Sequence, residues 1–270
     1  MSSSAATQIY YWPRSFLLRS FRFEQVRQYQ RASVTLIVAA SGGFGITTQG
    51  LGETQCSGVL LGPSSRRQGL RIAGADMREA VWILDVAPGT LQHRGLLDVL
   101  QRRPEARLSS AQLGRLQPLF AAQAEQPVLL PAQAQALHAQ AVDTLLPERA
   151  SRPLDPRVAQ VLQMLGERCL DEIEISELAA SVELSESRLR SLVRRELASN
   201  LVQVSRWSAA WQTMLHWQPG MTLTDAAHAA GFHDLPHANR TANQMFGLSP
   251  SRALDSERVL LVPCAEPIAS

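Results

Sequence analysis

The sequence predicts an α+β fold, with a strand-rich N-terminal part and an all-helical C-terminal part. Short β-branched and apolar runs, separated by glycine, proline and serine, follow residue 33. Apolar residues at helical spacing take over from residue 156, after a proline-rich segment at 147–156. A length of 270 residues is enough for two modest domains. We therefore place domains at 1–146 and 157–258, a linker at 147–156 and a tail at 259–270.

The composition is that of an ordinary globular chain, with 45% hydrophobic and 19% charged residues. No apolar run is long enough to span a bilayer, and the first residues do not form a secretory signal. We therefore expect a cytoplasmic protein without a membrane partner. The three cysteines, Cys56, Cys169 and Cys264, are far apart and form no C-x-x-C pair, so neither a disulfide framework nor a zinc site is expected.

The charge of the chain does not by itself predict a nucleic-acid partner. The formal net charge is +2, and all the positive charge is arginine because the sequence has no lysine. Between Arg152 and Arg258 there are 11 arginines and 13 acidic residues, a net of −2. The signal is local instead, because Arg188, Arg190, Arg194 and Arg195 are concentrated on one predicted helix.

The strand-like runs predict a small antiparallel sandwich or barrel. Aromatic residues between 10 and 21 supply a lead strand or a lid ahead of it. His93 and His138 are the only histidines before the linker and have no second histidine nearby, so a metal would lack ligands. The chain also has no P-loop, G-x-S-x-G motif or paired carboxylates. We therefore expect no enzyme, no metal and no cofactor.

Helical segments follow the strands. Leu113, Leu116 and Phe120 recur at helical spacing, and a second helix is expected from about Pro131 to Leu146, both packed on the sheet region. After the linker, Asp155 followed by Pro156 predicts a helix start, with the cap first and the proline just inside. Its apolar face consists of Val158, Val161, Leu162 and Leu165.

Two helix-turn-helix units follow. In the first, Leu178, Ala179 and Val182 face inward, Ser185 caps, and a second helix runs from about 187 to 196. Leu201–Trp217 is expected to connect the units, with Trp207 and Trp211 in the core. In the second unit, which spans Met221–Leu254, Thr222 and Asp225 form a capping box. Gly231 supplies a left-handed corner, Asp234 caps the last helix, and Pro236 lies in its first turn.

The side chains expected on the outer faces of the two second helices suit DNA. Arginine pairs with guanine, and asparagine or glutamine with adenine, through two hydrogen bonds in the major groove. The base-edge candidates are Ser187, Arg190, Ser191, His237, Asn239 and Arg240. The phosphate candidates are Arg188, Arg194, Arg195 and Gln244, and Asn243 also faces outward. Without a partner these would be ordinary polar helix faces.

The segment G-F-H-D-x-P-H…N-R…F-G-L-S-P-S resembles the second helix-turn-helix and terminal signature of the AraC/XylS family of bacterial transcription regulators. The first unit resembles the family's L-A-x-x-x-G-x-S-x-x-x-L-x-R-x-F-K, with Glu183 where glycine is usual and Ala198 for a later glycine. Glu183 must therefore adopt a positive φ or let the turn relax. The positions that match in the second unit are Gly231, Phe232, Asp234, His237, Arg240, Phe246, Gly247, Ser249 and Pro250.

The resemblance implies a sequence-specific regulator of transcription that binds double-stranded DNA, an activator that contacts RNA polymerase. It also implies a cupin-like β-barrel as the N-terminal domain, which controls the protein and pairs with its copy in a homodimer. The regulatory input is either a small-molecule effector or a regulatory protein. Two alternatives remain: an enzyme fused to a DNA-binding module, and an interaction protein whose degenerate helix-turn-helix units no longer bind DNA.

Overall fold

The computed structural model describes residues 7–25, 28–73, 79–147, 152–216, 221–247 and 259–264. Parts of several expectations fall outside these ranges. They are residues 148–151 of the expected linker at 147–156, Trp217 at the end of the connecting helix, the end of the second unit from residue 248 to Leu254 with the Ser249 and Pro250 pair, and the end of the tail at 265–270. Among the helices that the structure describes, none is both long and apolar enough to cross a membrane.

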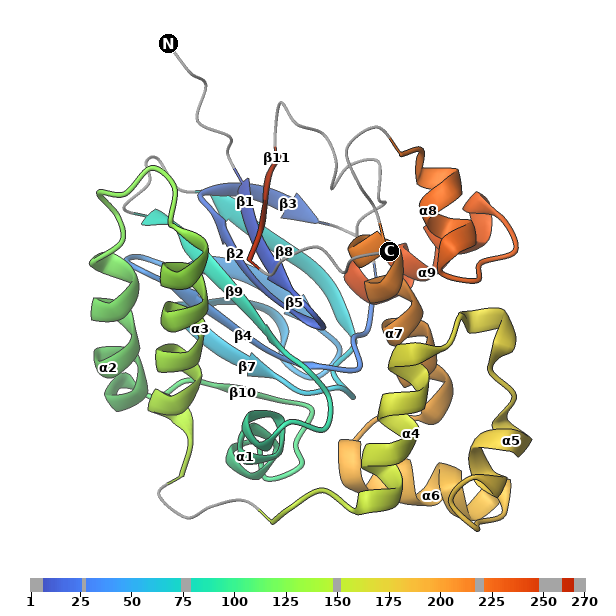
Figure 1. Ribbon diagram of the computed structural model, residues 1–270. Helices are drawn as coiled ribbons and strands as arrows, with labels where there is room; N and C mark the ends of the chain where they lie inside the picture. Colours follow the sequence, from blue (N-terminus) through green and yellow to red (C-terminus); the bar gives the residue numbers. More distant parts are fainter. Residues whose placement is uncertain are drawn as a thin grey trace.

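Two sheets form the core of the N-terminal part. One has seven strands in the order β10-β7-β4-β9-β2-β1-β11, and the other has four in the order β3-β8-β5-β6. Neighbouring strands are antiparallel except β1 and β11, which are parallel (Figure 1). The strands are β1 (Thr7–Trp12), β2 (Ser15–Ser20), β3 (Arg22–Gln25), β4 (Val34–Ala39), β5 (Phe44–Thr48), β6 (Gly52–Cys56), β7 (Gly58–Leu61), β8 (Arg67–Ala73), β9 (Val81–Val86), β10 (Glu105–Arg107) and β11 (Val259–Pro263).

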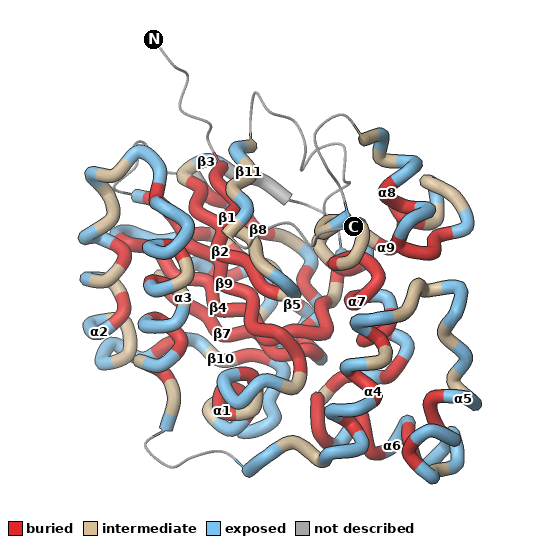
Figure 2. Tube along the Cα trace, viewed as in Figure 1, coloured by how far each residue is buried: buried red, intermediate tan, exposed pale blue. Residues whose placement is uncertain are grey.

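The central strands of the seven-stranded sheet, β7, β4, β9 and β2, are buried on both faces, whereas the edge strands β10 and β11 are partly exposed (Figure 2). Successive side chains of a strand point to opposite faces, so each strand serves two cores. In β4, Leu36 and Val38 pack in the core under the helices, whereas Ile37 and Ala39 pack in the core between the sheets. This double burial explains why the central strands are almost continuously apolar in sequence.

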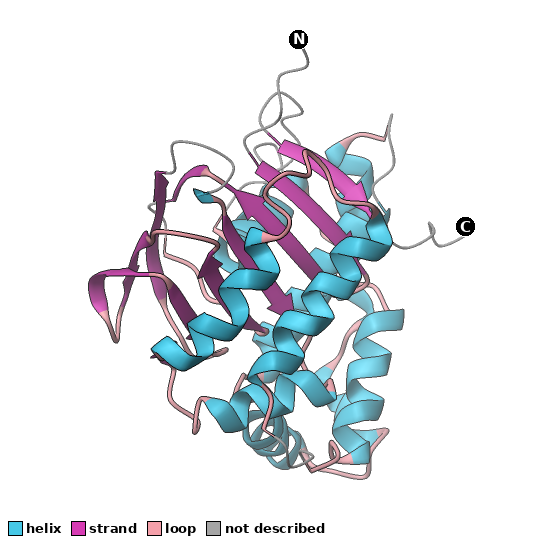
Figure 3. Ribbon diagram, turned by 90° about the vertical axis from the view of Figure 1, so that its left-hand side faces the viewer, coloured by secondary structure: helices cyan, strands magenta, loops and turns pink. Residues whose placement is uncertain are grey.

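Three helices cover the outer face of the seven-stranded sheet: α1 (Leu91–Val99), α2 (Ser110–Ala121) and α3 (Pro131–Leu145). Figure 3 shows α2 and α3 lying across this sheet. Thr90 caps α1, and Ser109 with Gln112 forms a capping box on α2. The helices expected on the sheet region are therefore present.

The C-terminal part lies on the other side of the sheets from α2 and α3 (Figure 1). Asp155 caps α4, and Pro156 is its first residue, as the sequence predicts. The α+β prediction is confirmed. The elements are α4 (Pro156–Glu167), the 3-10 turn η2 (Leu170–Glu172), α5 (Ile175–Ala180), α6 (Glu186–Leu197), α7 (Leu201–His216), α8 (Leu223–Ala229) and α9 (Leu235–Phe246).

The segment expected to begin a C-terminal tail instead starts with a strand. β11 returns to the N-terminal part and pairs with β1, from Thr7 opposite Val259 to Tyr11 opposite Pro263. The backbone N–H of Cys264 extends the pairing by donating to the carbonyl of Tyr11 over 2.8 Å. An apolar run of five residues is too short to show from sequence whether a sheet edge is available to it.

Candidate nucleic-acid interface

Helices α5 and α6 form the first helix-turn-helix unit. Leu178, Ala179 and Val182 are buried, as the pattern predicts. Glu183 adopts a φ of 55°, so the left-handed turn is kept although the residue is not glycine. Ser185 caps α6 by accepting a hydrogen bond from the backbone N–H of Arg188 over 3.4 Å.

The inner face of α6 is anchored by Leu189, Leu192 and Val193, all buried. The predicted site residues Ser187, Arg188, Arg190, Ser191, Arg194 and Arg195 are all exposed. Four of them share a depression of about 540 Å³ with the start of α7. Its lining residues are Ser187, Arg190, Ser191, Arg194, Asn200, Leu201 and Val202.

The arginines of α6 are available to a ligand. Arg190 pairs with Glu186 over 3.2 Å, but both side chains are about half exposed, and such pairs contribute little. Within the described part of the chain, the side chains of Arg188 and Arg194 have no polar partner. These guanidinium groups can therefore bind phosphates or base edges without breaking a strong contact.

Helices α8 and α9 form the second unit, with caps at the residues that the sequence predicts. The capping box expected at α8 is only half formed, because the Asp225 carboxylate accepts from the Thr222 hydroxyl over 2.6 Å and not from the Thr222 backbone N–H. Thr222 caps α8 by accepting from the backbone N–H of Asp225, and Asp234 caps α9 by accepting from that of His237. Gly231 has a φ of 76°, and a Cβ there would lie 2.6 Å from the backbone nitrogen of Leu170. Only glycine satisfies both the backbone angle and this close approach.

The predicted site residues of α9 differ in their surroundings. Arg240 is exposed, and among the described residues its side chain has no hydrogen bond. His237 is half-buried, with its ring edge-on to Phe232 at 5.2 Å between centroids. The side-chain amide of Asn243 donates to the carbonyl of Asn239 over 2.8 Å. Arg240 is thus the most available of the predicted side chains on this helix.

Gln244 faces the N-terminal part. Its backbone carbonyl accepts from the N–H of Gln30 over 2.9 Å, and its side chain contacts Arg206 of α7. Two residues further along α9, the ring of Phe246 lies 5.7 Å from the guanidinium carbon of Arg31. The C-terminal end of α9 is therefore an interdomain contact, which the sequence pattern did not reveal.

Helix α7 separates the two units. Trp207 and Trp211 are 1% exposed and pack edge-to-face, so the predicted core role is correct. Figure 1 shows α6 near the start of α7 and α8 at its far end, with α9 packed against it. With about 1.5 Å of rise per residue, its 16 residues span roughly 24 Å. One duplex turn is about 34 Å, so the spacing of α6 and α9 also depends on how each is set against α7.

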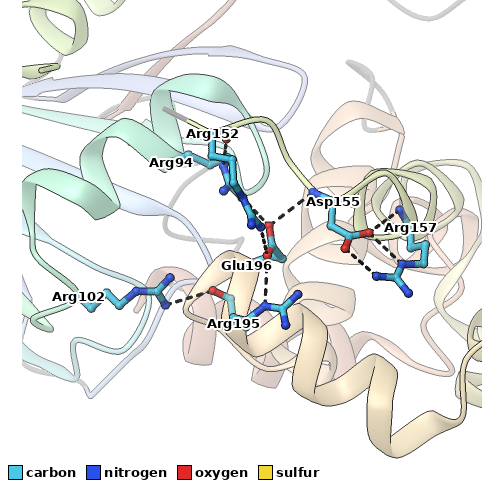
Figure 4. Close-up of polar contacts among 7 residues, drawn as sticks. All are labelled: Arg94, Arg102, Arg152, Asp155, Arg157, Arg195 and Glu196. Carbon is cyan, nitrogen blue, oxygen red and sulfur yellow. Dashed lines mark hydrogen bonds and ion pairs between the residues drawn. The ribbon is translucent and has the colours of Figure 1, made fainter. Parts of the chain in front are cut away.

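A charged cluster joins α6 to the N-terminal part (Figure 4). The carboxylate of Glu196 is 3% exposed and contacts Arg94 of α1 and Arg152 of the linker, each over 2.8 Å. Arg195 approaches it to 3.4 Å. Burial acts to raise the pKa of Glu196, but hydrogen bonds from Arg94 and the Asp155 N–H, and the nearby positive charge, lower that pKa below its ordinary value.

The sequence did not single out the partners of Glu196. Arg94 lies 102 residues away from it along the chain, so no local spacing connects the two. Asn200 and Val202, which line the depression beside α6, were also missed, because Asn200 directly precedes the connecting helix and Val202 lies on it. In the described part of the chain, no three His, Cys, Asp or Glu side chains lie close enough to hold a metal ion.

Comparison by sequence gives one family match. Residues 178–256 match the family described as "Helix-turn-helix domain", which is of the AraC type. This range begins in α5 and includes α6 to α9, so it covers both units described above. No curated protein matches the chain.

Comparison by structure extends the likeness to both parts. Apo ToxT from Vibrio cholerae, in a variant form, superposes with a TM-score of 0.59 at 9% identity, over 89% of this chain and 97% of that one. Wild-type ToxT with bound unsaturated fatty acid gives 0.55 at 11% identity, over 89% and 93%. ToxT bound to (E)-4-(8-methylnaphthalen-1-yl)but-3-enoic acid gives 0.54 at 9% identity, over 89% and 97%.

At these identities the likeness to ToxT establishes the fold. The helix-turn-helix match identifies the kind of domain at the C-terminal end. The chain therefore has a ToxT-like α+β fold and carries at 178–256 an AraC-type helix-turn-helix domain, the DNA-binding module of a family of transcription regulators.

Proposed function

We propose that the chain binds specific sites on double-stranded DNA through both α6 and α9 and regulates transcription from them. The observation that carries this is the exposed arginine on the second helix of each unit. Among the described residues, the side chains of Arg194 on α6 and Arg240 on α9 make no hydrogen bond or close ion pair, and both helices are held by complete turns and caps. Two helix-turn-helix units in one chain do what a dimer of single units does elsewhere.

Within this proposal the residues divide by position. Ser187, Arg190 and Ser191 on α6 and His237, Asn239 and Arg240 on α9 are assigned to base edges. Arg188, Arg194 and Arg195 are assigned to phosphates. Asn243 and Gln244 were also assigned to DNA, but the interdomain position of Gln244 makes it the weakest member of this set.

Selection of bound fragments from random DNA tests the function directly, because it needs no knowledge of the operator. On a selected site, Arg240→Ala is expected to reduce the binding free energy by about 1–3 kcal/mol and to relax the sequence preference at one base position. Arg194→Ala is expected to weaken all sequences alike and to flatten the salt dependence by about one phosphate. Competition binding at two salt concentrations separates the two, and equal behaviour of the variants contradicts the assignment.

We propose further that the protein is an activator that contacts RNA polymerase, as the resemblance to the AraC/XylS family implies. Transcription from a selected site with purified RNA polymerase measures this, and reduced transcription on adding the protein contradicts it. Pairing with a second copy through α3 is part of the same proposal. Its support is that α3 is exposed along one side, and sedimentation of the full chain tests it.

The regulatory input proposed here is a small-molecule effector in the cleft between the two parts. This cleft has a volume of about 480 Å³, and its lining includes Arg66 from the N-terminal part and Arg206 from α7. The two ToxT ligands are a fatty acid and a butenoic acid, each with an apolar body and an acid group. An acid of this class fits a cleft with two arginines.

Calorimetric titration with an unsaturated fatty acid tests this input, and Arg206→Ala is expected to weaken binding at least tenfold. Absence of binding favours a regulatory protein as the input instead. The alternative of a non-DNA-binding interaction protein is decided by the selection experiment, because such a chain enriches no sequence.

A further inference from the structure

The turn that follows α1 presents arginines beside the end of α6. Arg102 and Arg103 are exposed, and we call them the α1-turn arginines. Gln101 and Arg102 both adopt left-handed backbone conformations, with φ of 49° and 58°. Consecutive left-handed residues other than glycine are uncommon and unfavourable. The fold thus keeps an unfavourable turn that holds two cationic side chains at its surface.

One hydrogen bond places this turn at the C-terminal end of α6. The guanidinium of Arg102 donates to the backbone carbonyl of Arg195 over 3.1 Å (Figure 4). Capping of α6 by a cation explains this contact, since the last carbonyls of a helix favour positive charge. It does not explain Arg103, whose guanidinium makes, among the described residues, two long contacts of 3.4 Å each, to Leu100 and Gln101 within its own turn.

The excess of positive charge lies outside the C-terminal part. The whole chain carries +2 and the stretch from Arg152 to Arg258 carries −2, so the rest carries +4. The C-terminal part has no net positive charge of its own, so a duplex bound to it alone is attracted only by its local arginines, such as those of α6. Phosphate contacts dominate the affinity of proteins for DNA, so cations near the interface but outside the helix-turn-helix units gain importance.

The acidic groups near this end of α6 do not cancel those cations. Glu196 is buried and engaged by Arg94 and Arg152, and Asp155 is paired with Arg157 over 2.8 Å. Arg195 remains 61% exposed although it approaches Glu196. Arg194 and Arg195 in the last turn of α6 and the α1-turn arginines are therefore exposed cations at the same end of the helix, and the contact of Arg102 with the carbonyl of Arg195 joins them.

We propose that the DNA-binding surface continues from α6 onto the N-terminal part, where Arg102 and Arg103 bind backbone phosphates of the duplex that α6 enters. This rests on the proposed function and assigns to it a second, sequence-independent contact. A recognition helix lies in the major groove, and the residues at its C-terminal end meet the backbone that borders the groove. In this fold that end of α6 is the one beside the α1-turn (Figure 4).

The arrangement has a regulatory consequence. The α1-turn belongs to the N-terminal part, whereas α6 belongs to the helix-turn-helix domain. An effector that shifts one part against the other changes how many phosphates the chain contacts at once. Because each phosphate contributes about 0.9 to the slope of log K against log salt concentration, regulation is visible as a change in that slope.

The test is the salt dependence of binding to a selected DNA site, measured with the full chain. Arg103→Ala is expected to reduce the slope by about 0.9, and the Arg102→Ala, Arg103→Ala double variant by about 1.8. Arg115→Ala is the matched control, because Arg115 is equally exposed but lies on α2. It is expected to bind as the unchanged chain does. Arg102→Lys is expected to keep the slope, since a phosphate accepts either cation.

Phosphate-ethylation interference supplies a positional measurement. We expect one or two phosphates whose ethylation blocks the unchanged chain but not the double variant. If the salt slope of the double variant equals the slopes of the unchanged chain and of Arg115→Ala, the inference is overturned and the proposed function still stands. If the unchanged chain selects no DNA sequence, both fail. Thermal unfolding of each variant shows whether a weakened variant is still folded.

Discussion

Glu196→Gln tests whether α6, the second helix of the first helix-turn-helix unit, is fixed to the N-terminal part by charge. The substitution keeps the size of the side chain and one oxygen acceptor but removes the negative charge. Arg94, which is 13% exposed, then loses the carboxylate that it contacts over 2.8 Å, and its charge is left without that anionic partner. Arg152 and Arg195 are 67% and 61% exposed and return to water at little cost.

The magnitude follows from these exposures. Removing one partner of a fully buried ion pair costs about 3–5 kcal/mol, and an exposed pair contributes about 0.2–1 kcal/mol. Only the contact with Arg94 is close to the buried case, and glutamine retains part of its hydrogen bonding. We therefore expect Glu196→Gln to lower the free energy of unfolding by about 2–3 kcal/mol.

Urea unfolding of the full chain measures this loss, and a double-mutant cycle with Arg94→Gln isolates the pair. The expected coupling energy is about 1–2 kcal/mol. Glu186→Gln on the same helix is the matched control, because its pair with Arg190 is exposed, and a change of at most about 0.5 kcal/mol is expected. A coupling energy below about 0.3 kcal/mol, or equal losses for the two glutamine variants, refutes the reasoning.

Three further changes test other parts of the fold by urea unfolding. Glu183→Gly places glycine at a backbone φ of 55° and is expected to raise the free energy of unfolding by about 1 kcal/mol. A lower free energy of unfolding in this variant would contradict the left-handed turn at residue 183. Gly231→Ala and Gly42→Ala share the strain of a positive φ, but only at Gly231 does a Cβ come within 3 Å of neighbouring atoms. The loss at Gly231 is expected to be larger, and equal losses contradict this. Burial is the main cause that lowers the pKa of His93 to about 3, so the folded chain keeps this ring neutral where the unfolded chain, with a pKa near 6.5, takes up a proton. The free energy of unfolding is therefore not reduced by this group above about pH 6.5, and it falls by roughly 2 kcal/mol between pH 7 and pH 5 as the unfolded chain takes up the proton. The variant His93→Leu should lack this part of the pH dependence. An unchanged pH dependence in that variant shows that other groups cause it.

Local features of the helix-turn-helix units could be predicted well from the sequence. Caps such as Ser185 and Asp234, and the corner at Gly231, follow from backbone chemistry within a few residues. The buried positions of Trp207 and Trp211 follow from helical spacing in the same way. The contact of Gln244 with the N-terminal part does not follow from such local rules, because its partner Gln30 is far away in the sequence.

The strand-rich part shows the limit of the same reasoning. Strand rhythm indicated a sandwich or barrel, but strand order depends on pairings between residues far apart in the chain. The pairing of β1 with β11, from Thr7 opposite Val259, is the extreme case. No local pattern distinguishes such a strand from a loose apolar tail, because the sheet edge that receives it lies at the other end of the chain.

The amino-acid sequence by itself determined the helix-turn-helix units, their caps and turns, and the arginines and amides on their second helices, because these depend on neighbours within about one helical turn. Only the tertiary structure decided that Glu196 joins α6 to α1, that α9 ends against the N-terminal part, and that Arg102 lies beside Arg195. These contacts connect residues that are distant in sequence. Their existence depends on how the two parts pack, which no spacing along the chain encodes.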